Sequence, residues 1–129
     1  MNTLIVYYSR TGHNEQMAKR LQEETSADID QIIDSKNRDG MLGCVVVTPL
    51  WGGVLPPATR TYLAQNGDKF TRFAFISICG RGEENRNALA DVRSMAHKEP
   101  FATLLVKEEE FANQEYEGKL KTFAHMLPH

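Results

Sequence analysis

A short polar segment near the N-terminus combines residue types that bind phosphate. It places two hydroxyls, a glycine and an amide within six residues, Ser9-Arg10-Thr11-Gly12-His13-Asn14. Gly12 can adopt a positive φ, and Asn14 is of a type that caps the start of a helix. Free backbone N–H groups, hydroxyls and the positive end of a following helix together make an anion site. A capped turn without a ligand explains the same residues equally well from this segment alone.

A second segment, 48–57, contains a tryptophan between prolines and glycines. Prolines stiffen the backbone here, and two glycines let it approach a flat ligand closely. Aromatic rings stack on other π systems, so a phosphate site beside such a ring indicates a phosphorylated planar ligand. A tryptophan at the end of a strand is more often a lid on the core, and that interpretation stays open. The residues of this wall are Pro49, Leu50, Trp51, Gly52 and Gly53.

Several better-known phosphate and nucleotide motifs do not match these segments. No Gly-Lys-Ser or Gly-Lys-Thr follows the first segment, which excludes a P-loop. A third glycine-containing segment, Gly80-Arg81-Gly82, has Asn85 where a dinucleotide-binding fingerprint has its last glycine. Cys79 does not begin a tyrosine-phosphatase loop, because Arg86 comes one residue too late.

Strand and helix patterns alternate around these segments. Short runs rich in β-branched and aromatic residues predict strands at 4–8, 28–34, 44–47, 72–78 and 101–106. Apolar residues at helical spacing predict helices at 14–25, 57–66, 88–96 and 116–127. Pro57 and Gly67 give the second helix a proline start and a glycine stop, and Glu108 to Glu110 are interpreted as a solvated connection. The alternation predicts an α/β domain with a parallel sheet, in which ligands bind beyond the carboxyl ends of the strands.

One connection is too short to contain a helix. Nine residues, 35–43, join the second and third strands, whereas a parallel crossover usually takes a dozen or more. We therefore expect one sheet face to be partly uncovered over the first two strands. A second copy of the chain is expected to cover that apolar surface, which makes a homodimer.

The composition excludes several classes of protein. The chain of 129 residues has the length of one domain. Fifteen basic and seventeen acidic side chains give a net charge of −2, too close to zero for a nucleic-acid footprint. There is no apolar run of membrane-spanning length and no secretory signal, and Cys44 and Cys79 form no disulfide or metal-ligand pattern. We expect a soluble cytoplasmic protein with no nucleic-acid, membrane or metal partner.

Taken together, the three segments resemble those of the flavodoxin family. Residues 9–14 are similar to its FMN-phosphate loop, Thr48-Pro49-Leu50-Trp51-Gly52 to the loop that sets an aromatic ring against the isoalloxazine, and Ser77-Ile78-Cys79-Gly80-Arg81-Gly82 to the loop around the pyrimidine edge. The resemblance covers essentially the whole chain. It implies a single flavodoxin-like domain, 1–129, built as a three-layer sandwich. The five-stranded parallel sheet has the order 2-1-3-4-5, and the helix between strands two and three is missing.

The resemblance also implies FMN as the cofactor and electron transfer with a redox partner protein or a small electron acceptor. The third segment carries no aromatic residue and the net charge is nearly neutral, whereas flavodoxin carriers are acidic. Both features favour an alternative, an NAD(P)H-dependent reductase of quinones or similar acceptors. A flavin-free binding module on the same fold is a third hypothesis, against which the intact first segment and Trp51 argue. The implied cofactor-binding residues are Ser9, Arg10, Thr11, Gly12, His13, Asn14, Pro49, Leu50, Trp51, Gly52, Gly53, Cys79, Gly80, Arg81 and Gly82, and no catalytic residue is implied.

Overall fold

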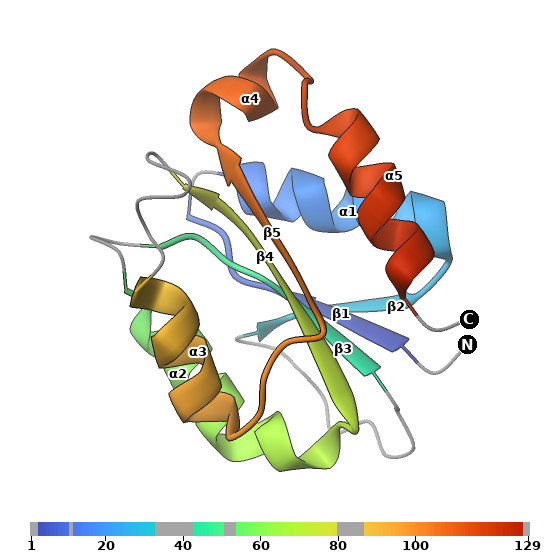
Figure 1. The fold of residues 1–129 in the computed structure, drawn as a ribbon. Coiled ribbons are helices and arrows are strands. Elements are labelled where there is room, and N and C mark those ends of the chain that lie inside the picture. The colour runs from blue at the N-terminus through green and yellow to red at the C-terminus, as the bar shows by residue number, and fades with distance from the viewer. Residues whose placement is uncertain (1–2, 11, 33–42, 51–53, 80–86, 128–129) are drawn as a thin grey trace.

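The computed structural model describes residues 3–10, 12–32, 43–50, 54–79 and 87–127, and it places five strands in one parallel sheet. The order across the sheet is β2-β1-β3-β4-β5, which confirms the predicted order (Figure 1). Each neighbouring pair is parallel, with Ile5 opposite both Ile29 of β2 and Val45 of β3. The strands are β1 (Thr3–Tyr7), β2 (Asp28–Gln31), β3 (Gly43–Val47), β4 (Arg72–Cys79) and β5 (Ala102–Lys107).

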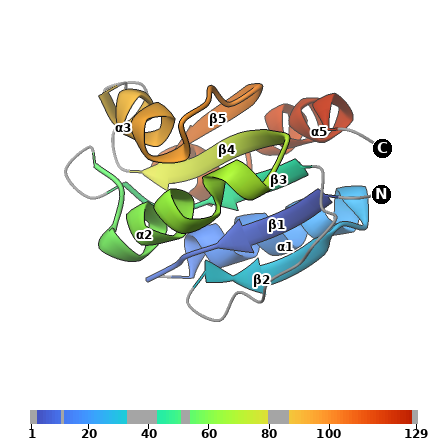
Figure 2. The same cartoon turned by 90° about the horizontal axis from the view of Figure 1, so that it is seen from below.

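Helices cover both faces of this sheet and complete a three-layer sandwich. The pair α1 and α5 lies on one face, and the pair α2 and α3 lies on the other (Figure 2). Every strand and helix that the sequence predicts is present, with small shifts at the ends. Residues 33–34 of the predicted second strand lie outside the described residues. The helices are α1 (His13–Thr25), α2 (Pro57–Asn66), the 3-10 turn η2 (Gly67–Lys69), α3 (Asn87–Ala96), α4 (Glu108–Ala112) and α5 (Glu117–Met126). None of the helices in the described part of the chain is long and apolar enough to cross a membrane.

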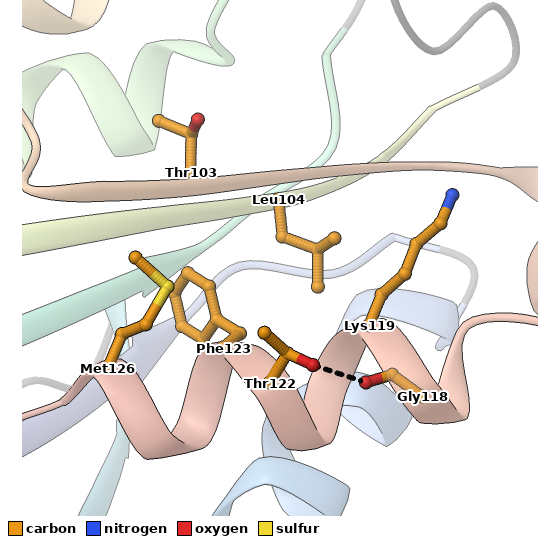
Figure 3. Close-up of a pocket in the computed structure, with 7 residues that line it drawn as sticks. All are labelled: Thr103, Leu104, Gly118, Lys119, Thr122, Phe123 and Met126. Carbon is orange, nitrogen blue, oxygen red and sulfur yellow. Dashed lines mark hydrogen bonds between the residues drawn. The ribbon is translucent and has the colours of Figure 1, made fainter.

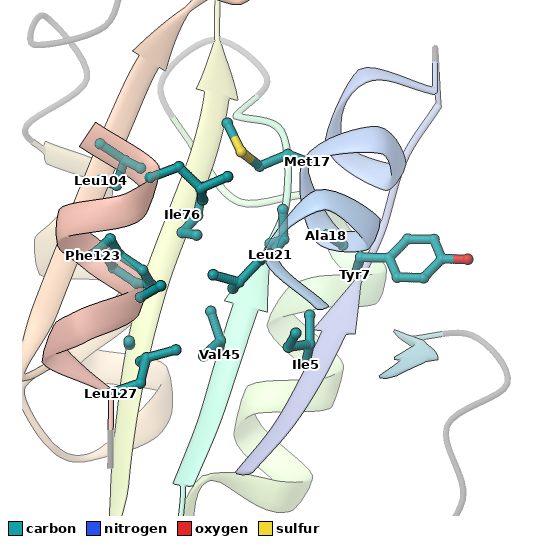
Figure 4. Packing of buried hydrophobic residues seen from close by; sticks show 14 of the residues in the cluster. Ile5, Tyr7, Met17, Ala18, Leu21, Val45, Ile76, Leu104, Phe123 and Leu127 are labelled. Carbon is teal, nitrogen blue, oxygen red and sulfur yellow. The ribbon is translucent and has the colours of Figure 1, made fainter. Parts of the chain in front are cut away.

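The core consists of two apolar layers, one on each side of the sheet. Ile5 packs in the layer with α1 and α5, and its neighbour Val6 packs in the layer with α2 and α3. Figure 4 shows the first layer, in which Leu21 of α1 and Phe123 of α5 meet the strands. Because both faces are covered, β1 and β3 are buried along their whole length, as the continuous apolar runs predict.

The acidic run after β5 differs from its prediction. Glu108 to Glu110 form the first turn of a short helix, α4, and are not an irregular connection. Negative side chains are stabilising in a helical first turn, where the helix dipole is positive. The Glu110 carboxylate accepts a hydrogen bond from the Lys107 N–H at 3.2 Å and one from Lys119 Nζ at 2.6 Å. These bonds, that of Lys119 foremost, lower the pKa of Glu110 and tie α4 to β5 and α5.

Gly67 follows α2 for a reason other than the predicted glycine stop. Its φ is −57°, an ordinary right-handed value, and the chain continues into η2. A Cβ at this position would lie 2.9 Å from the Cα and carbonyl oxygen of Ala96 in α3. The glycine therefore permits close packing between two helices and does not supply a left-handed cap.

The expected gap in the helical cover concerns residues 33–42, which lie outside the described residues. The apolar side chains on that face are nevertheless covered within the single chain. Leu4 is 1% exposed, Val6 0% and Ile32 7%. The expectation of an uncovered apolar face is thus wrong for these side chains, and the reason given for a homodimer does not hold. The oligomeric state itself stays a prediction.

Candidate functional site

The first predicted segment forms a tight turn between the carboxyl end of β1 and the start of α1. Gly12 is the N-cap residue, with a left-handed φ of 97°. Its N–H donates to Ser9 Oγ at 3.0 Å, and its carbonyl accepts the first helical bond from Gln16 N–H at 3.0 Å. No side chain of the described residues caps this helix. The N–H groups of the first turn thus have no side-chain acceptor among the described residues.

Asn14 is not the helix cap that its residue type suggested. It is 3% exposed, and its amide is engaged with the backbone of Ile78 in β4. Ile78 N–H donates to Asn14 Oδ1 at 3.1 Å, and Asn14 Nδ2 donates to the Ile78 carbonyl at 3.5 Å. The side chain thus connects the first turn of α1 to the end of β4, from which the third predicted segment leaves.

His13 is the first residue of α1 and reaches across to α4. Its Nδ1 lies 2.5 Å from Glu108 Oε2, and the side chain is 41% exposed. Its ring lies against Phe111, with centroids 5.1 Å apart and an interplanar angle of 34°. Phe111 in turn stacks on Tyr116 at 5.1 Å. One nitrogen and one face of the His13 ring are therefore already in contact with α4.

The second predicted segment is anchored at both of its described ends. Thr48 is fully buried, and its Oγ1 lies 2.8 Å from Thr59 Oγ1 of α2. Thr48 N–H donates to the Ile76 carbonyl of β4 at 3.1 Å. Leu50 and Leu55 are buried in the layer with α2 and α3. The segment therefore leaves the carboxyl end of β3 from a fixed base.

Several predicted site residues cannot be placed in this geometry. Ser9, Arg10, Gly12, His13 and Asn14 gather at the carboxyl end of β1, and Pro49 and Leu50 follow β3. Cys79 is the last residue of β4, and only its backbone is described. The roles assigned to the rest stay predictions, because Thr11, Trp51, Gly52, Gly53, Gly80, Arg81 and Gly82 lie outside the described residues.

Comparison with solved structures identifies the fold. No family model matches the chain, and no curated protein matches it either. A Lactobacillus acidophilus flavoprotein in complex with FMN is 14% identical, with a TM-score of 0.71 over 88% of this chain and 98% of that one. A WrbA-like flavodoxin from Agrobacterium tumefaciens is 16% identical, with a TM-score of 0.64 over 96% and 97%. A flavodoxin from the domain Archaea is 14% identical, with a TM-score of 0.62 over 97% and 99%. The chain has the flavodoxin-like fold.

Sequence reasoning missed the contribution of α4 to the candidate site. Glu108 and Phe111 reach the start of α1 from a helix that was not expected. The acidic first turn of α4 fits a helix start, and it fits a solvated connection equally well. Its contact with His13 spans 95 residues of sequence, and no local pattern announces such a pair.

Among the cavities lined by described residues, a small one adjoins the candidate site and a larger one lies away from it. A small cavity of about 80 Å³ is bounded by Tyr7, Tyr8, Ser9, Glu15 and Gln31, beside the first segment. A larger one of about 340 Å³ opens between β5 and α5 (Figure 3). Its floor is Leu104 and Phe123, and Met126 is 54% exposed at its rim. Because Thr103 and Leu104 lie in the first half of β5, this cavity is remote from the carboxyl ends of the strands.

Cys44 lies on β3 and takes no part in this site. It is buried against the α2 layer. Burial disfavours the thiolate and so raises the pKa of the Cys44 thiol from 9.0 to about 12, although a hydrogen bond with Tyr62 acts in the opposite direction. A buried thiol of this kind is chemically inert at neutral pH.

Proposed function

We propose that this chain binds FMN without a covalent bond and acts in electron transfer. The single observation that carries the proposal is the turn at the end of β1, where left-handed Gly12 starts α1 with no described side-chain cap. That turn adjoins the point where the strand order reverses, between β1 and β3. Ligands of open α/β sheets bind at such switch points. The similar L. acidophilus flavoprotein was solved with FMN, which supports the same ligand class here.

The donor set of the turn fits a phosphate group. The uncapped N–H groups of α1 and the positive helix end favour an anion, and Ser9 keeps the turn closed through Gly12. The Asn14 amide is occupied by Ile78, so this residue would contribute its backbone N–H. Arg10 is exposed in the same turn and would add positive charge.

The remaining predicted residues would enclose the ring. Trp51 would stack on the isoalloxazine, beside Pro49, Leu50, Gly52 and Gly53, and the backbone from Cys79 through Gly80 and Arg81 to Gly82 would bind the pyrimidine edge. Bound FMN would supply one- and two-electron redox chemistry, which belongs to the cofactor. The described chain contributes the fixed bases of these loops, since Thr48 is held by Thr59 and by Ile76.

FMN binding is tested by titrating the purified protein and following flavin fluorescence. We expect quenching at micromolar FMN and weaker binding by Trp51→Ala, because stacking of aromatic rings stabilises the complex. Unchanged affinity in Trp51→Ala would show that the Trp51 ring does not contact the flavin. No quenching by the wild-type protein would contradict FMN binding itself.

Electron transfer requires a separate test, because the near-neutral net charge of −2 also suits a reductase. If the chain is an electron carrier, its reduced bound flavin should pass electrons to a one-electron acceptor protein, in an amount proportional to the flavin bound. Steady oxidation of NAD(P)H with a quinone, without any partner reductase, would instead favour the NAD(P)H-dependent reductase. The partner proposed here is accordingly a redox protein or a small electron acceptor.

A further inference from the structure

Helix α4 contacts the start of α1 through Glu108 and Phe111, which both meet His13. Glu108 is the first residue of α4, and His13 is the first residue of α1. The two side chains meet at 2.5 Å between Nδ1 and Oε2, and both are partly exposed. His13 directly follows Gly12, which is the residue that begins the proposed phosphate-binding turn.

This contact fixes which nitrogen of the imidazole remains available. An ionised carboxylate only accepts hydrogen bonds, so Nδ1 carries the proton and donates it to Glu108 Oε2. The ring is also held on one face by Phe111, which is itself backed by Tyr116. The described residues form no hydrogen bond with Nε2. The ring therefore has one engaged nitrogen, one engaged face and one nitrogen left for a ligand.

Holding α4 in place does not require the His13–Glu108 pair. Glu110 already connects this short helix to the backbone of Lys107 and to Lys119 of α5. Partly exposed ion pairs contribute little to folding stability, and this one is 41% and 45% exposed. A stability role is thus a weak explanation for a close pair at the edge of the proposed phosphate site.

We infer that Glu108 is a positioning residue for FMN. It accepts from Nδ1–H and so orients the His13 ring, which in its doubly protonated form donates from Nε2–H to the phosphate. This inference rests on the proposed function, because it concerns the same site. A second hydrogen bond to the opposite ring nitrogen is a common way of fixing the orientation of a ligand-binding histidine. It extends the site beyond the three loops to α4.

The test compares affinities for FMN and riboflavin, which differ only in the phosphate. Glu108→Ala should weaken FMN binding by about tenfold to a hundredfold, as expected for the loss of one hydrogen bond to a charged group. Riboflavin binding should change by less than about twofold on the same reasoning. Glu108→Gln should keep most of the FMN affinity, because its amide oxygen still accepts from Nδ1. Glu109→Ala is the matched control, since it removes the neighbouring first-turn charge of α4.

A double-mutant cycle separates positioning from a structural effect. His13→Ala should lose as much FMN affinity as Glu108→Ala, and the double variant should lose no more, because the two residues act as one unit. Additive losses, equal losses for riboflavin, or an unchanged FMN affinity in Glu108→Ala would each overturn the inference while leaving the proposed function intact. A wild-type protein that binds no FMN would overturn both.

Discussion

Asn14 offers a direct test of how the site is connected to the sheet. Its Oδ1 accepts the Ile78 N–H at 3.1 Å, inside the protein, where only 3% of Asn14 is exposed. Asn14→Ala removes this acceptor and leaves the N–H of a central strand buried without a partner. An unsatisfied buried donor costs about 1–3 kcal/mol. The second bond, at 3.5 Å, adds little, so we expect a loss of about 2 kcal/mol in the free energy of unfolding.

The assay is urea denaturation of the ligand-free protein, with Asn66→Ala as the matched control. Asn66 Nδ2 donates to the Tyr62 carbonyl at 3.0 Å near the end of α2. Because Asn66 is only half-buried, water can replace its amide and the cost should stay below about 1 kcal/mol. If Asn14→Ala is no less stable than Asn66→Ala, then the Asn14–Ile78 bridge does not hold the site to β4.

Four further substitutions test other features of the fold. Gly67→Ala should cost about 1–3 kcal/mol, because its Cβ would meet the backbone of Ala96 at 2.9 Å. A Cβ at Gly118 meets nothing within 4 Å, so Gly118→Ala should stabilise α5 by about 0.5–1 kcal/mol. If the denaturation midpoints of Gly67→Ala and Gly118→Ala shift in the same direction, this pair of predictions is contradicted. Gly12→Ala forces a φ of 97° on a residue with a side chain, so it should cost about 1–2 kcal/mol and weaken FMN binding; an unchanged titration would contradict this. The native state keeps the Cys44 thiol neutral up to a pKa of about 12, whereas the unfolded thiol ionises near 9.0. Stability should therefore fall above pH 9. Between about pH 8 and 10, Cys44→Ala should lose about 1 kcal/mol less than wild type in urea denaturation, and equal losses would contradict the assignment.

The strands and the long helices could be predicted because their burial leaves a local pattern. The continuous run Val45-Val46-Val47 belongs to a strand covered on both faces. Met17 and Leu21 recur four residues apart on the buried side of α1. Because every central strand must bury both faces, the order of elements along the chain also restricted the topology to few choices.

The short helix α4 left no such pattern. None of its residues is buried, so it has no apolar stripe to detect. Its glutamates fit a helical first turn and a solvated loop equally well, and only the contacts with Lys107 and Lys119 decide between them.

The connections within the site could not be predicted for a different reason. Asn14 and Ile78 are 64 residues apart in sequence, and His13 and Glu108 are 95 apart. A polar residue at a helix start predicts a cap, and Asn14 instead uses its amide on a neighbouring strand. Tertiary proximity of this kind is set by the packing of α1 against the sheet, which residue types alone do not specify.

In the proposed function, the turn from Ser9 to Asn14 holds the phosphate of FMN. The most direct measurement is an equilibrium titration of the flavin-free protein with FMN and, in parallel, with riboflavin. We expect one FMN bound per chain at micromolar concentration, with quenched flavin fluorescence and clearly weaker binding of riboflavin. Equal affinity for the two flavins, or no binding of either, would contradict it.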